Sequence, residues 1–381
     1  MVTRSFWLER IESALSRRSV VWLFGVRRAG KTVLCRSLED VEYFDCELPS
    51  VRRSLVDPER FFASLRGKKV ALDEIHRLPD PSETLKVAAD HFPDVRVVAT
   101  GSSTLAATAK FSDTLTGRKA TVWLTPMMSR DLVDFGGHAL ERRLWSGGIP
   151  PFFLSGPDSP AEEFQEWLDS FWARDIQELF RLERRGSFLR FVELLLVHSG
   201  GIFEATSYAG PCEVSRTTIT NYLAVLEETK IVHVLRPFST RRATEIVAAP
   251  KVYAFDTGFV RHARALQAPR PEDYGRFWEH YVLNEVYARI PAAQAQYWRT
   301  KQHHGVDLVF DRRARGLLAA ECKWSEPDAE ELRGLRALLR AYPSAACLVV
   351  TPVTSREYDI GLEEGTVTVT GLEGLIERLS G

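Results

Sequence analysis

A glycine-rich loop near the N-terminus constrains the fold of this chain more than any other feature. Residues 25–32 read Gly-Val-Arg-Arg-Ala-Gly-Lys-Thr, which satisfies every fixed position of the phosphate-binding pattern Gly-x4-Gly-Lys-Ser/Thr. The apolar run Val20–Phe24 precedes the loop, and the helix-like stretch Thr32–Leu38 follows it. A buried strand, this loop and a helix in that order predict a nucleotide site in an α/β domain.

Each residue type in the loop has a chemical task. Gly25 and Gly30 allow backbone N–H groups to close around phosphates, and the N-terminus of the following helix adds partial positive charge. Lys31 is expected to reach the β- and γ-phosphates, and Thr32 is expected to offer its hydroxyl to Mg²⁺. Arg28 is expected near the phosphates or in a structural role. ATP and Mg²⁺ are therefore the predicted cofactors.

A second apolar run, Val70–Leu72, ends in two carboxylates, Asp73 and Glu74. ATP hydrolysis needs a positioned water more than a strong base, so Glu74 is predicted to orient and polarise that water. Asp73 is predicted to hold the metal together with Thr32. The alternative is a solvated acidic pair at a strand end, and the complete loop upstream favours the catalytic interpretation.

A third run, Val95–Thr100, leads into the turn Gly101-Ser102-Ser103. Ser102 is predicted to hydrogen-bond the attacking water or the γ-phosphate, and an ordinary turn after a strand is the alternative. The runs Val41–Asp45 and Thr121–Leu124 also read as buried strands. Because helix-like segments lie between these runs, the pattern indicates a parallel sheet with helical crossovers.

The bulk properties of the chain exclude several classes of protein. A length of 381 residues predicts two or three domains. A formal net charge of −1 argues against a uniformly basic nucleic-acid coat. The five cysteines are widely spaced and odd in number, which fits reduced, buried thiols better than a zinc site or a full disulfide set. No stretch has the pattern of a signal peptide or a bilayer span, so a cytoplasmic protein without a membrane partner is expected.

The order of these motifs resembles that of the AAA+ ATPases. After the loop, the acidic pair and the Thr100-Gly101-Ser102 turn comes Leu115-Thr116-Gly117-Arg118, just before a strand. More narrowly, the chain resembles the prokaryotic AAA+ family that carries a winged helix and a C-terminal nuclease-like domain and has no assigned function. The resemblance implies that Arg118 is an arginine finger, which stabilises transition-state charge in a neighbouring subunit. A homo-oligomeric ring, with a hexamer favoured, follows from that role; a solvated surface arginine is the alternative.

The segment Glu213–Leu223 reads as a turn followed by the recognition-like helix of a winged helix. Ser215 would cap this helix, and the wing would run from Val232–Leu235 to Val252–Phe255. Short polar and basic side chains on the exposed face and in the wing suit phosphate and base contacts, so DNA is the predicted partner. The residues predicted to contact DNA are Arg216, Thr217, Thr220, Asn221, Arg241 and Arg242. A module for protein contacts is the alternative.

The last third of the chain shows a second α/β pattern that resembles the PD-(D/E)xK nucleases. Asp307 lies in a predicted strand, and Glu321-Cys322-Lys323 ends the next one. Strand alternation puts Glu321 and Lys323 on the same face. The resemblance implies that Asp307 and Glu321 bind one or two Mg²⁺ ions, that Lys323 positions water, and that Glu285 joins from the helix Phe277–Ile290. A fold that grips DNA or partners without cutting is the alternative.

These patterns predict four parts of an α/β chain. They are a P-loop AAA+ core over residues 1–137, a helical lid or linker over 138–207, a winged helix over 208–256 and a restriction-endonuclease-like α/β domain over 257–381. The leading hypothesis is a ring-forming ATPase that converts ATP and water to ADP and phosphate and remodels or translocates on DNA, branched DNA included. The alternatives are an ATP-regulated, metal-dependent endonuclease and a nucleotide-gated switch for protein interactions.

Overall fold

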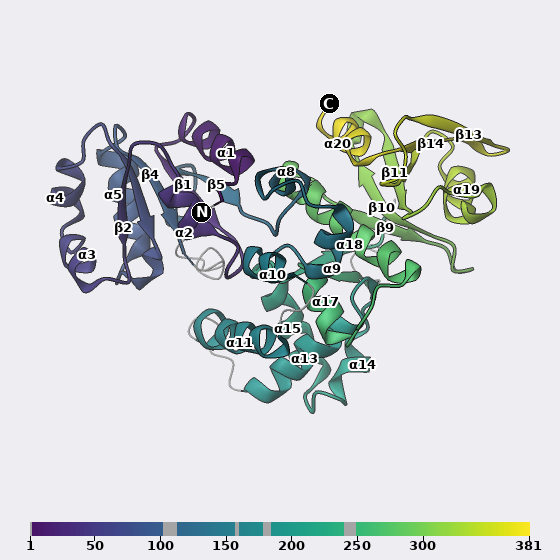
Figure 1. The fold of residues 1–381 in the computed structure, drawn as a ribbon, viewed down its shortest axis with the longest axis horizontal. Helices are drawn as coiled ribbons and strands as arrows, with labels where there is room; N and C mark the ends of the chain where they lie inside the picture. The colour runs from purple at the N-terminus through teal and green to yellow at the C-terminus, as the bar shows by residue number, and fades with distance from the viewer. Residues whose placement is uncertain (1, 102–112, 157–159, 178–183, 240–248) are drawn as a thin grey trace. The chain divides into compact units, whose positions relative to one another are not determined.

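The computed structural model describes residues 2–101, 113–156, 160–177, 184–239 and 249–381 (Figure 1). The chain divides into two compact units by its internal contacts. The N-terminal unit comprises Met1–Arg143, Gly148–Leu189 and Leu223–Ile231, and the C-terminal unit comprises Leu144–Gly147, Arg190–Tyr222 and Val232–Gly381. The finer division into four parts stays a prediction.

A five-stranded parallel sheet in the order β2-β3-β4-β1-β5 organises the N-terminal unit. Its strands are β1 (Val20–Phe24), β2 (Val41–Asp45), β3 (Lys69–Asp73), β4 (Arg96–Thr100) and β5 (Lys119–Trp123). The central strands are almost wholly buried, as expected when helices cover both faces of a parallel sheet. Since β4 lies between β1 and β3, the loop after β1 and the carboxylates after β3 lie on either side of the end of β4. The predicted α/β fold with a parallel N-terminal sheet is confirmed.

Local capping signals explain where several helices of this unit begin. Helices α4 and α5 both start at a proline, and the preceding Asp57 and Asp80 accept hydrogen bonds from the backbone N–H groups of Arg60 and Glu83. A π-helix, η3 (Trp172–Ile176), follows α11 directly. The helices that lie wholly in this unit are α1 (Ser5–Leu15), α2 (Lys31–Arg36), α3 (Pro49–Ser54), α4 (Pro58–Ala63), α5 (Pro81–His91), α8 (Ser129–Asp134), α10 (Pro150–Ser155) and α11 (Ala161–Phe171), with the 3-10 turn η1 (Ile75–Arg77).

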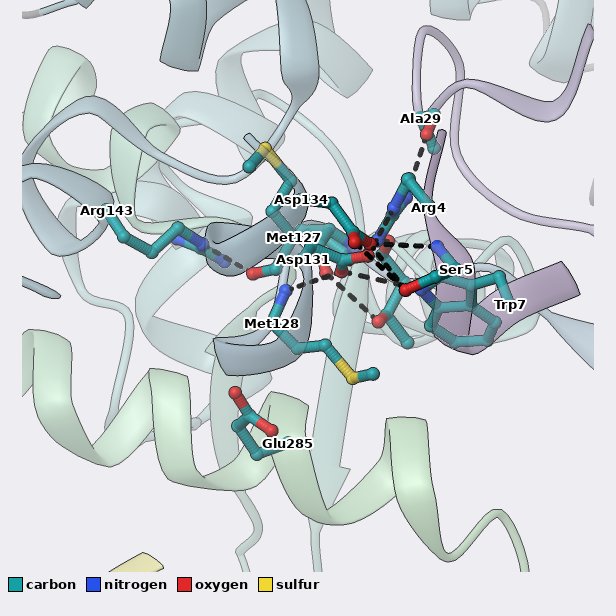
Figure 2. Close-up of polar contacts among 12 residues, drawn as sticks. Arg4, Ser5, Trp7, Ala29, Met127, Met128, Asp131, Asp134, Arg143 and Glu285 are labelled. Atoms are coloured by element: carbon teal, nitrogen blue, oxygen red, sulfur yellow. Dashed lines mark hydrogen bonds and ion pairs between the residues drawn. The ribbon is translucent and has the colours of Figure 1, made fainter. Parts of the chain in front are cut away.

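A buried ion pair ties the start of the chain to the glycine-rich loop and to α8 (Figure 2). Arg4 Nε and Nη2 donate to the two carboxylate oxygens of Asp131 over 2.8 and 2.6 Å. Arg4 Nη1 donates to the carbonyl of Ala29 in the loop over 3.0 Å, and Nη2 donates to the carbonyl of Thr125 over 3.1 Å. The side chains of Arg4 and Asp131 are only 4% and 0% exposed. Because a guanidinium is planar and rigid, this set of partners holds the loop backbone at Ala29 in one place.

Two sheets form the C-terminal unit. The first has the order β6-β8-β7 and the second has the order β13-β14-β12-β11-β10-β9. The strands are β6 (Gly201–Ile202), β7 (Val232–Leu235), β8 (Lys251–Ala254), β9 (Gln296–Arg299), β10 (Gly305–Asp311), β11 (Leu317–Cys322), β12 (Ala346–Val350), β13 (Tyr358–Leu362) and β14 (Gly365–Thr370). β7 has the bounds predicted for the first wing strand, and β8 begins and ends one residue earlier than predicted, whereas β13 and β14 were not predicted.

The helices around these sheets complete the unit. They are α14 (Ala205–Ala209), α17 (Thr257–Ala263), α18 (Pro271–Arg289), α19 (Arg333–Ala341) and α20 (Leu372–Ser380), with the 3-10 turns η4 (Arg313–Arg315) and η5 (Ala329–Glu331). Three more helices have residues in both units: α9 (Leu140–Ser146), α13 (Arg185–Val197) and α15 (Arg216–Glu228).

Backbone hydrogen bonds join the two sheets of the C-terminal unit. The N–H of Phe238 donates to the carbonyl of Tyr297 over 2.6 Å, and the N–H of Tyr297 donates to the carbonyl of Arg236 over 3.1 Å. Pro237 and Tyr297 form a parallel bridge, so the chain that leaves β7 extends the edge of β9. The Phe238 ring also packs against the apolar core of the six-stranded sheet. Apart from Leu223–Ile231, the segment predicted as a winged helix therefore belongs to the same compact unit as the segment predicted as a nuclease-like domain.

Two expectations concern the chain as a whole. Within the ranges that the structure describes, no helix combines the length and apolarity needed to cross a bilayer. All five cysteines are free and buried, as the cysteine spacing predicts.

Replacement of Arg4 by methionine is expected to lower the free energy of unfolding by about 3–5 kcal/mol, because it leaves Asp131 charged and buried without this partner. The double variant Arg4→Met/Asp131→Leu is expected to recover much of the loss, because apolar side chains can replace a buried ion pair. Urea unfolding followed by tryptophan fluorescence measures both. An Arg4→Met variant as stable as the wild type would contradict the importance of this pair.

Candidate active site

A cavity of about 770 Å³ lies over the glycine-rich loop in the N-terminal unit. Its walls come from the loop, from the ends of β2 and β3, from α10 and α11, and from the residues before α1. The structure brings most of the predicted nucleotide-site residues to this cavity, namely Gly25, Arg28, Gly30, Lys31, Thr32, Asp73 and Glu74. Ser102 lies outside the described residues.

The two glycines of the loop meet different backbone requirements. Gly30 has a φ of +100°, a left-handed conformation that side chains rarely adopt. At Gly25, a Cβ atom would lie 2.3 Å from the carbonyl oxygen of Leu124, so only glycine fits against the chain leaving β5. The Lys31 ammonium donates to the carbonyls of Gly25 and Val26 over 2.9 and 3.3 Å. Since an ammonium has three protons, one remains for a phosphate oxygen.

Both carboxylate oxygens of Asp73 are held by hydroxyl groups. Tyr43 donates to Oδ2 over 2.7 Å, and Thr100 at the end of β4 donates to Oδ1. The Thr100 hydroxyl also accepts a hydrogen bond from the backbone N–H of Glu74 over 3.0 Å. Burial and the hydrogen bond to Asp73 raise the pKa of Tyr43, so its hydroxyl keeps the proton that it donates. Asp73 is thereby fixed in orientation before any ligand arrives.

The backbone and electrostatics of Glu74 suit a group that orients water. Its φ of 54° and ψ of 45° are left-handed, which is uncommon for a residue with a side chain. Glu74 Oε2 lies 3.1 Å from His76 Nδ1. Burial alone would raise the pKa of Glu74, but His76 and the charges of Lys31 and Arg27 outweigh it and lower the pKa to about 2. An ionised carboxylate of such low basicity can position a water molecule and polarise it.

Helix α11 and the π-helix that follows it contact the loop directly. Arg28 Nη2 lies 2.8 Å from Glu166 Oε1, and the indole N–H of Trp167 donates to the carbonyl of Arg27 over 3.1 Å. Arg27 Nη1 lies 4.0 Å from Asp175 Oδ2 in the π-helix. Asp175 lines the same cavity, so the π-helical segment forms part of its wall. Short π-helical turns are frequent at functional sites.

The residues of the cavity fit a magnesium ion. The hydroxyl of Thr32 and the carboxylate of Asp73 both line it, and Mg²⁺ is usually bound by one or two carboxylates together with substrate phosphates. Within the described ranges, no group of three or more His, Cys, Asp or Glu side chains is arranged to hold a metal by itself. Thr32 and Asp73 would therefore hold the ion jointly with the nucleotide.

Arg118 does not line the nucleotide cavity of its own chain. Its Nε donates to Asp90 over 2.7 Å, and its Nη1 donates to the carbonyl of Thr114 over 3.2 Å. It borders a separate hollow of about 310 Å³ with Arg17 and Arg96.

A β-bulge in β10 places Asp307. Val306 pairs with Trp298 and Val309 pairs with Gln296, so β10 holds one extra residue at Asp307 and Leu308. Asp307 Oδ2 accepts a hydrogen bond from the N–H of Cys322 over 3.1 Å, which puts it beside the Glu-x-Lys segment.

The predicted lysine and glutamate also meet. Lys323 Nζ lies 3.1 Å from Glu321 Oε1, as strand alternation predicts. Burial and the charge of Asp307 raise the pKa of Glu321, while Lys323 opposes the shift. Asp307, Glu321 and Lys323 therefore form one cluster. Lys251 from β8 joins them, since its Nζ lies 3.3 Å from Asp307 Oδ1.

The helix carboxylate next to this cluster is Glu279, which corrects the prediction of Glu285. Glu285 is fully buried, and its Oε2 lies 3.0 Å from Arg289 Nε. Glu279 accepts a hydrogen bond from Tyr253 over 3.0 Å, and burial and the charge of Asp307 raise its pKa. Six residues rotate a side chain by about 240° around a helix, so the two glutamates of α18 face different surroundings.

The four predicted DNA contacts that the structure describes lie on the exposed face of α15. They are Arg216, Thr217, Thr220 and Asn221. Ser215 caps this helix as predicted, because its hydroxyl accepts from the N–H of Thr218 over 3.1 Å. The Phe191 ring packs edge-on against Phe203 and at a tilt against Tyr222 in the core of this module. Arg241 and Arg242 lie outside the described residues.

Sequence reasoning missed Tyr43, Thr100, Lys251 and Glu279. Thr100 is the last residue of a predicted strand, so a search for polar residues at strand ends would have found it. No motif marks Lys251 or Glu279, because their roles depend on how β8 and α18 pack in the same unit.

Comparison with known families supports the nucleotide-binding assignment. Residues 17–133 match the family model described as an AAA domain. Residues 137–270 and 274–371 match two models described as domains of unknown function, DUF8612 and DUF4143. The chain is 29% identical over 316 residues to the uncharacterized protein Rv2008c of Mycobacterium tuberculosis and to Mb2031c of Mycobacterium bovis. Each alignment covers 80% of this chain and 70% of the relative.

Two solved structures show a more distant likeness. The Walker-type ATPase PABY2304 of Pyrococcus abyssi is 16% identical with a TM-score of 0.44, covering 69% of this chain and 96% of that chain. A DNA polymerase III gamma subunit-related protein of Thermotoga maritima is 13% identical with a TM-score of 0.29, covering 59% and 97%. Scores this low carry no functional argument. The AAA-domain match, the P-loop and the parallel sheet support an AAA+ ATPase, whereas the winged-helix and nuclease-like assignments stay predictions.

The variant Thr100→Val is expected to destabilise the protein by about 1–3 kcal/mol, because Asp73 and the N–H of Glu74 each lose a buried hydrogen bond while the side-chain volume is kept. Thr100→Ser retains the hydroxyl and is the matched control. Chemical unfolding of the three proteins measures the difference. Indistinguishable stability of the valine and serine variants would contradict the role of the hydroxyl.

The pair of Glu74 and His76 predicts a pH-dependent stability difference. With a folded pKa of about 2 against about 4.3 when unfolded, ionised Glu74 stabilises the fold above about pH 4.3, and this contribution is lost as the pH falls toward 2. His76→Gln removes one cause of the low pKa. The variant should therefore have a lower free energy of unfolding than the wild type at pH 5, and this difference should become smaller as the pH falls toward 2. Urea unfolding across this pH range tests the prediction. A difference in free energy of unfolding that does not change with pH would argue against a stabilising contact between Glu74 and His76.

Proposed function

We propose that this protein is an ATP-hydrolysing AAA+ protein that assembles into a ring and remodels or translocates on DNA. The observation that carries the proposal is that Lys31, Thr32, Asp73 and Glu74 line a single cavity of the N-terminal unit. These four residue types are the parts that phosphoryl transfer to water requires.

Each group in the cavity has a place in the reaction. Backbone amides of the loop and the remaining proton of Lys31 hold the phosphates. When bound, Mg²⁺ supplies positive charge that offsets the charge developing on the phosphate oxygens. Asp73, fixed by Tyr43 and Thr100, presents its carboxylate without first having to reorient. Glu74 stays ionised and orients the attacking water.

The position of Arg118 supports assembly into a ring. An arginine that stabilises the transition state must reach the γ-phosphate, and Arg118 does not line the cavity of its own chain. In the proposed assembly, a neighbouring subunit receives it. A closed ring satisfies this requirement for every subunit, since a repeated head-to-tail interface closes into a cycle.

Action on DNA is supported by the module around α15. A helix, a short strand, two helices and two further strands follow one another, and the three strands form the sheet β6-β8-β7, which is the order expected of a winged helix. The exposed side of α15 carries a basic residue and three short polar ones, which suits backbone contacts with little base readout.

A DNA-stimulated ATPase assay tests the proposal. The wild type is expected to hydrolyse ATP faster when duplex, single-stranded or forked DNA is added, and Lys31→Ala is expected to lose binding and turnover. Arg118→Ala is expected to lower kcat on the order of a thousandfold while still binding ATP. Arg53→Ala, an exposed arginine on α3, is the matched control. Tight ATP binding without turnover would favour a nucleotide-gated switch, and turnover indifferent to every DNA would refute action on DNA.

A metal-dependent endonuclease is the second candidate, favoured by the cluster of Asp307, Glu321 and Lys323. The carboxylates would hold the metal and Lys323 would orient water. Plasmid cleavage with Mg²⁺ or Mn²⁺ is expected from the wild type and not from Lys323→Ala. Equal cleavage by both proteins would place any nuclease activity elsewhere.

A further inference from the structure

A hollow of about 310 Å³, separate from the nucleotide cavity, lies at the edge of the parallel sheet where its strands begin. The glycine-rich loop and the carboxylates after β3 lie at the other edge, where the strands end. Three neighbouring strands, in the order β4-β1-β5, each bring an arginine to the hollow (Figure 1). Arg18 lies two residues before β1, Arg96 is the first residue of β4, and Arg118 directly precedes β5. Because adjacent strands are about 4.8 Å apart, these three strand starts lie within about 10 Å of each other.

The charge lining this hollow is unbalanced. The four arginines that line it are Arg17, Arg18, Arg96 and Arg118. Among the lining residues that the structure describes, Asp90 is the only carboxylate, and its Oδ1 already accepts from Arg118 Nε over 2.7 Å. Within the described ranges, the other three arginines form no ion pair. A guanidinium stays charged at physiological pH, so an excess of three positive charges attracts an anion to this hollow.

Backbone carbonyls at the end of α1 hold two of these arginines in position. Arg17 Nε donates to the carbonyl of Ser13 over 3.2 Å, and Arg96 Nη1 donates to the carbonyl of Leu15 over 2.9 Å. Both carbonyls belong to the last turn of α1, where carbonyl groups have no partner within the helix. Capping the helix uses one N–H of each guanidinium, and a guanidinium has five. The two groups are therefore held in place while most of their donors remain for a ligand.

The arrangement of the arginines narrows the choice of anion. A carboxylate presents two oxygens in one plane, which a single guanidinium fork satisfies, whereas a phosphate group can accept from several arginines at once. Arginines that approach from three strands match the phosphate. We propose that this hollow binds a phosphate group, supplied either by free phosphate or by the backbone of a nucleic acid. Binding here does not depend on ATP hydrolysis at the loop. Because Arg118 lines the hollow, a bound phosphate would compete with the ring contact proposed above.

Titration calorimetry on the full-length chain tests the proposal in a Lys31→Ala background, which weakens phosphate binding at the loop. The titrations use low ionic strength, because salt screens exposed charges. Inorganic phosphate is expected to bind at least about tenfold more tightly than acetate, because only phosphate can accept charge-assisted hydrogen bonds from several arginines together. Absence of phosphate binding, or acetate binding as tight as phosphate binding, would overturn the proposal.

Variants in the same background locate the binding and separate it from folding. Arg17→Gln/Arg96→Gln is expected to weaken phosphate binding by about tenfold or more, because two charged donors are lost. Arg53→Gln, at an exposed arginine on α3, should bind phosphate like the parent. Asp90→Asn should tighten phosphate binding, on the order of threefold, because it removes the competing carboxylate from Arg118. Loss of folding cannot produce tighter binding, and unchanged phosphate affinity in the double arginine variant would refute the assignment.

A single-stranded oligonucleotide identifies the source of the phosphate group. It is titrated into the Lys31→Ala parent and into the parent with Arg17→Gln/Arg96→Gln added. Weaker oligonucleotide binding by the double arginine variant would identify the backbone of a nucleic acid as the ligand. Equal oligonucleotide binding, together with weaker binding of inorganic phosphate, would identify free phosphate.

Discussion

The hydrogen bond from Arg4 to the carbonyl of Ala29 holds the nucleotide loop from outside the motif. A loop that binds phosphates with backbone amides has to keep those amides aligned. Arg4 fixes one point of the loop and is itself fixed by Asp131. Gly25, pressed against the carbonyl of Leu124, fixes another. The loop is therefore clamped between the residues before α1 and the chain leaving β5.

The strand order of the sheet also determines how Asp73 is oriented. Because β4 lies between β1 and β3, the hydroxyl of Thr100 reaches both Asp73 and the backbone of Glu74. Tyr43, in the middle of β2, donates to Asp73 from the strand on the other side of β3. The carboxylate that would share Mg²⁺ is oriented by its flanking strands, so the chemistry of the site depends on the sheet as a whole.

Patterns of apolar residues located the strands of the N-terminal sheet and the nucleotide motif, whereas they missed β13 and β14 and did not reveal how the elements pack. The strands β1, β2 and β7 fall at the predicted residues, since short apolar runs bounded by turns constrain them strongly. The helix carboxylate beside the Asp307 cluster is Glu279 and not the predicted Glu285. Sequence spacing alone does not reveal which side of a long helix faces a distant strand. The bulge at Asp307 left no trace in the pattern of apolar residues, since one extra residue in a strand is indistinguishable from a longer strand.

The bridge at Pro237 and Tyr297 has a mechanical consequence. Peptide hydrogen bonds connect the chain that leaves the three-stranded sheet to the edge of the six-stranded one. A force applied at the exposed face of α15 would be transmitted through this hydrogen-bonded bridge to the six-stranded sheet. The two sheets of the C-terminal unit should therefore move together when such a force is applied.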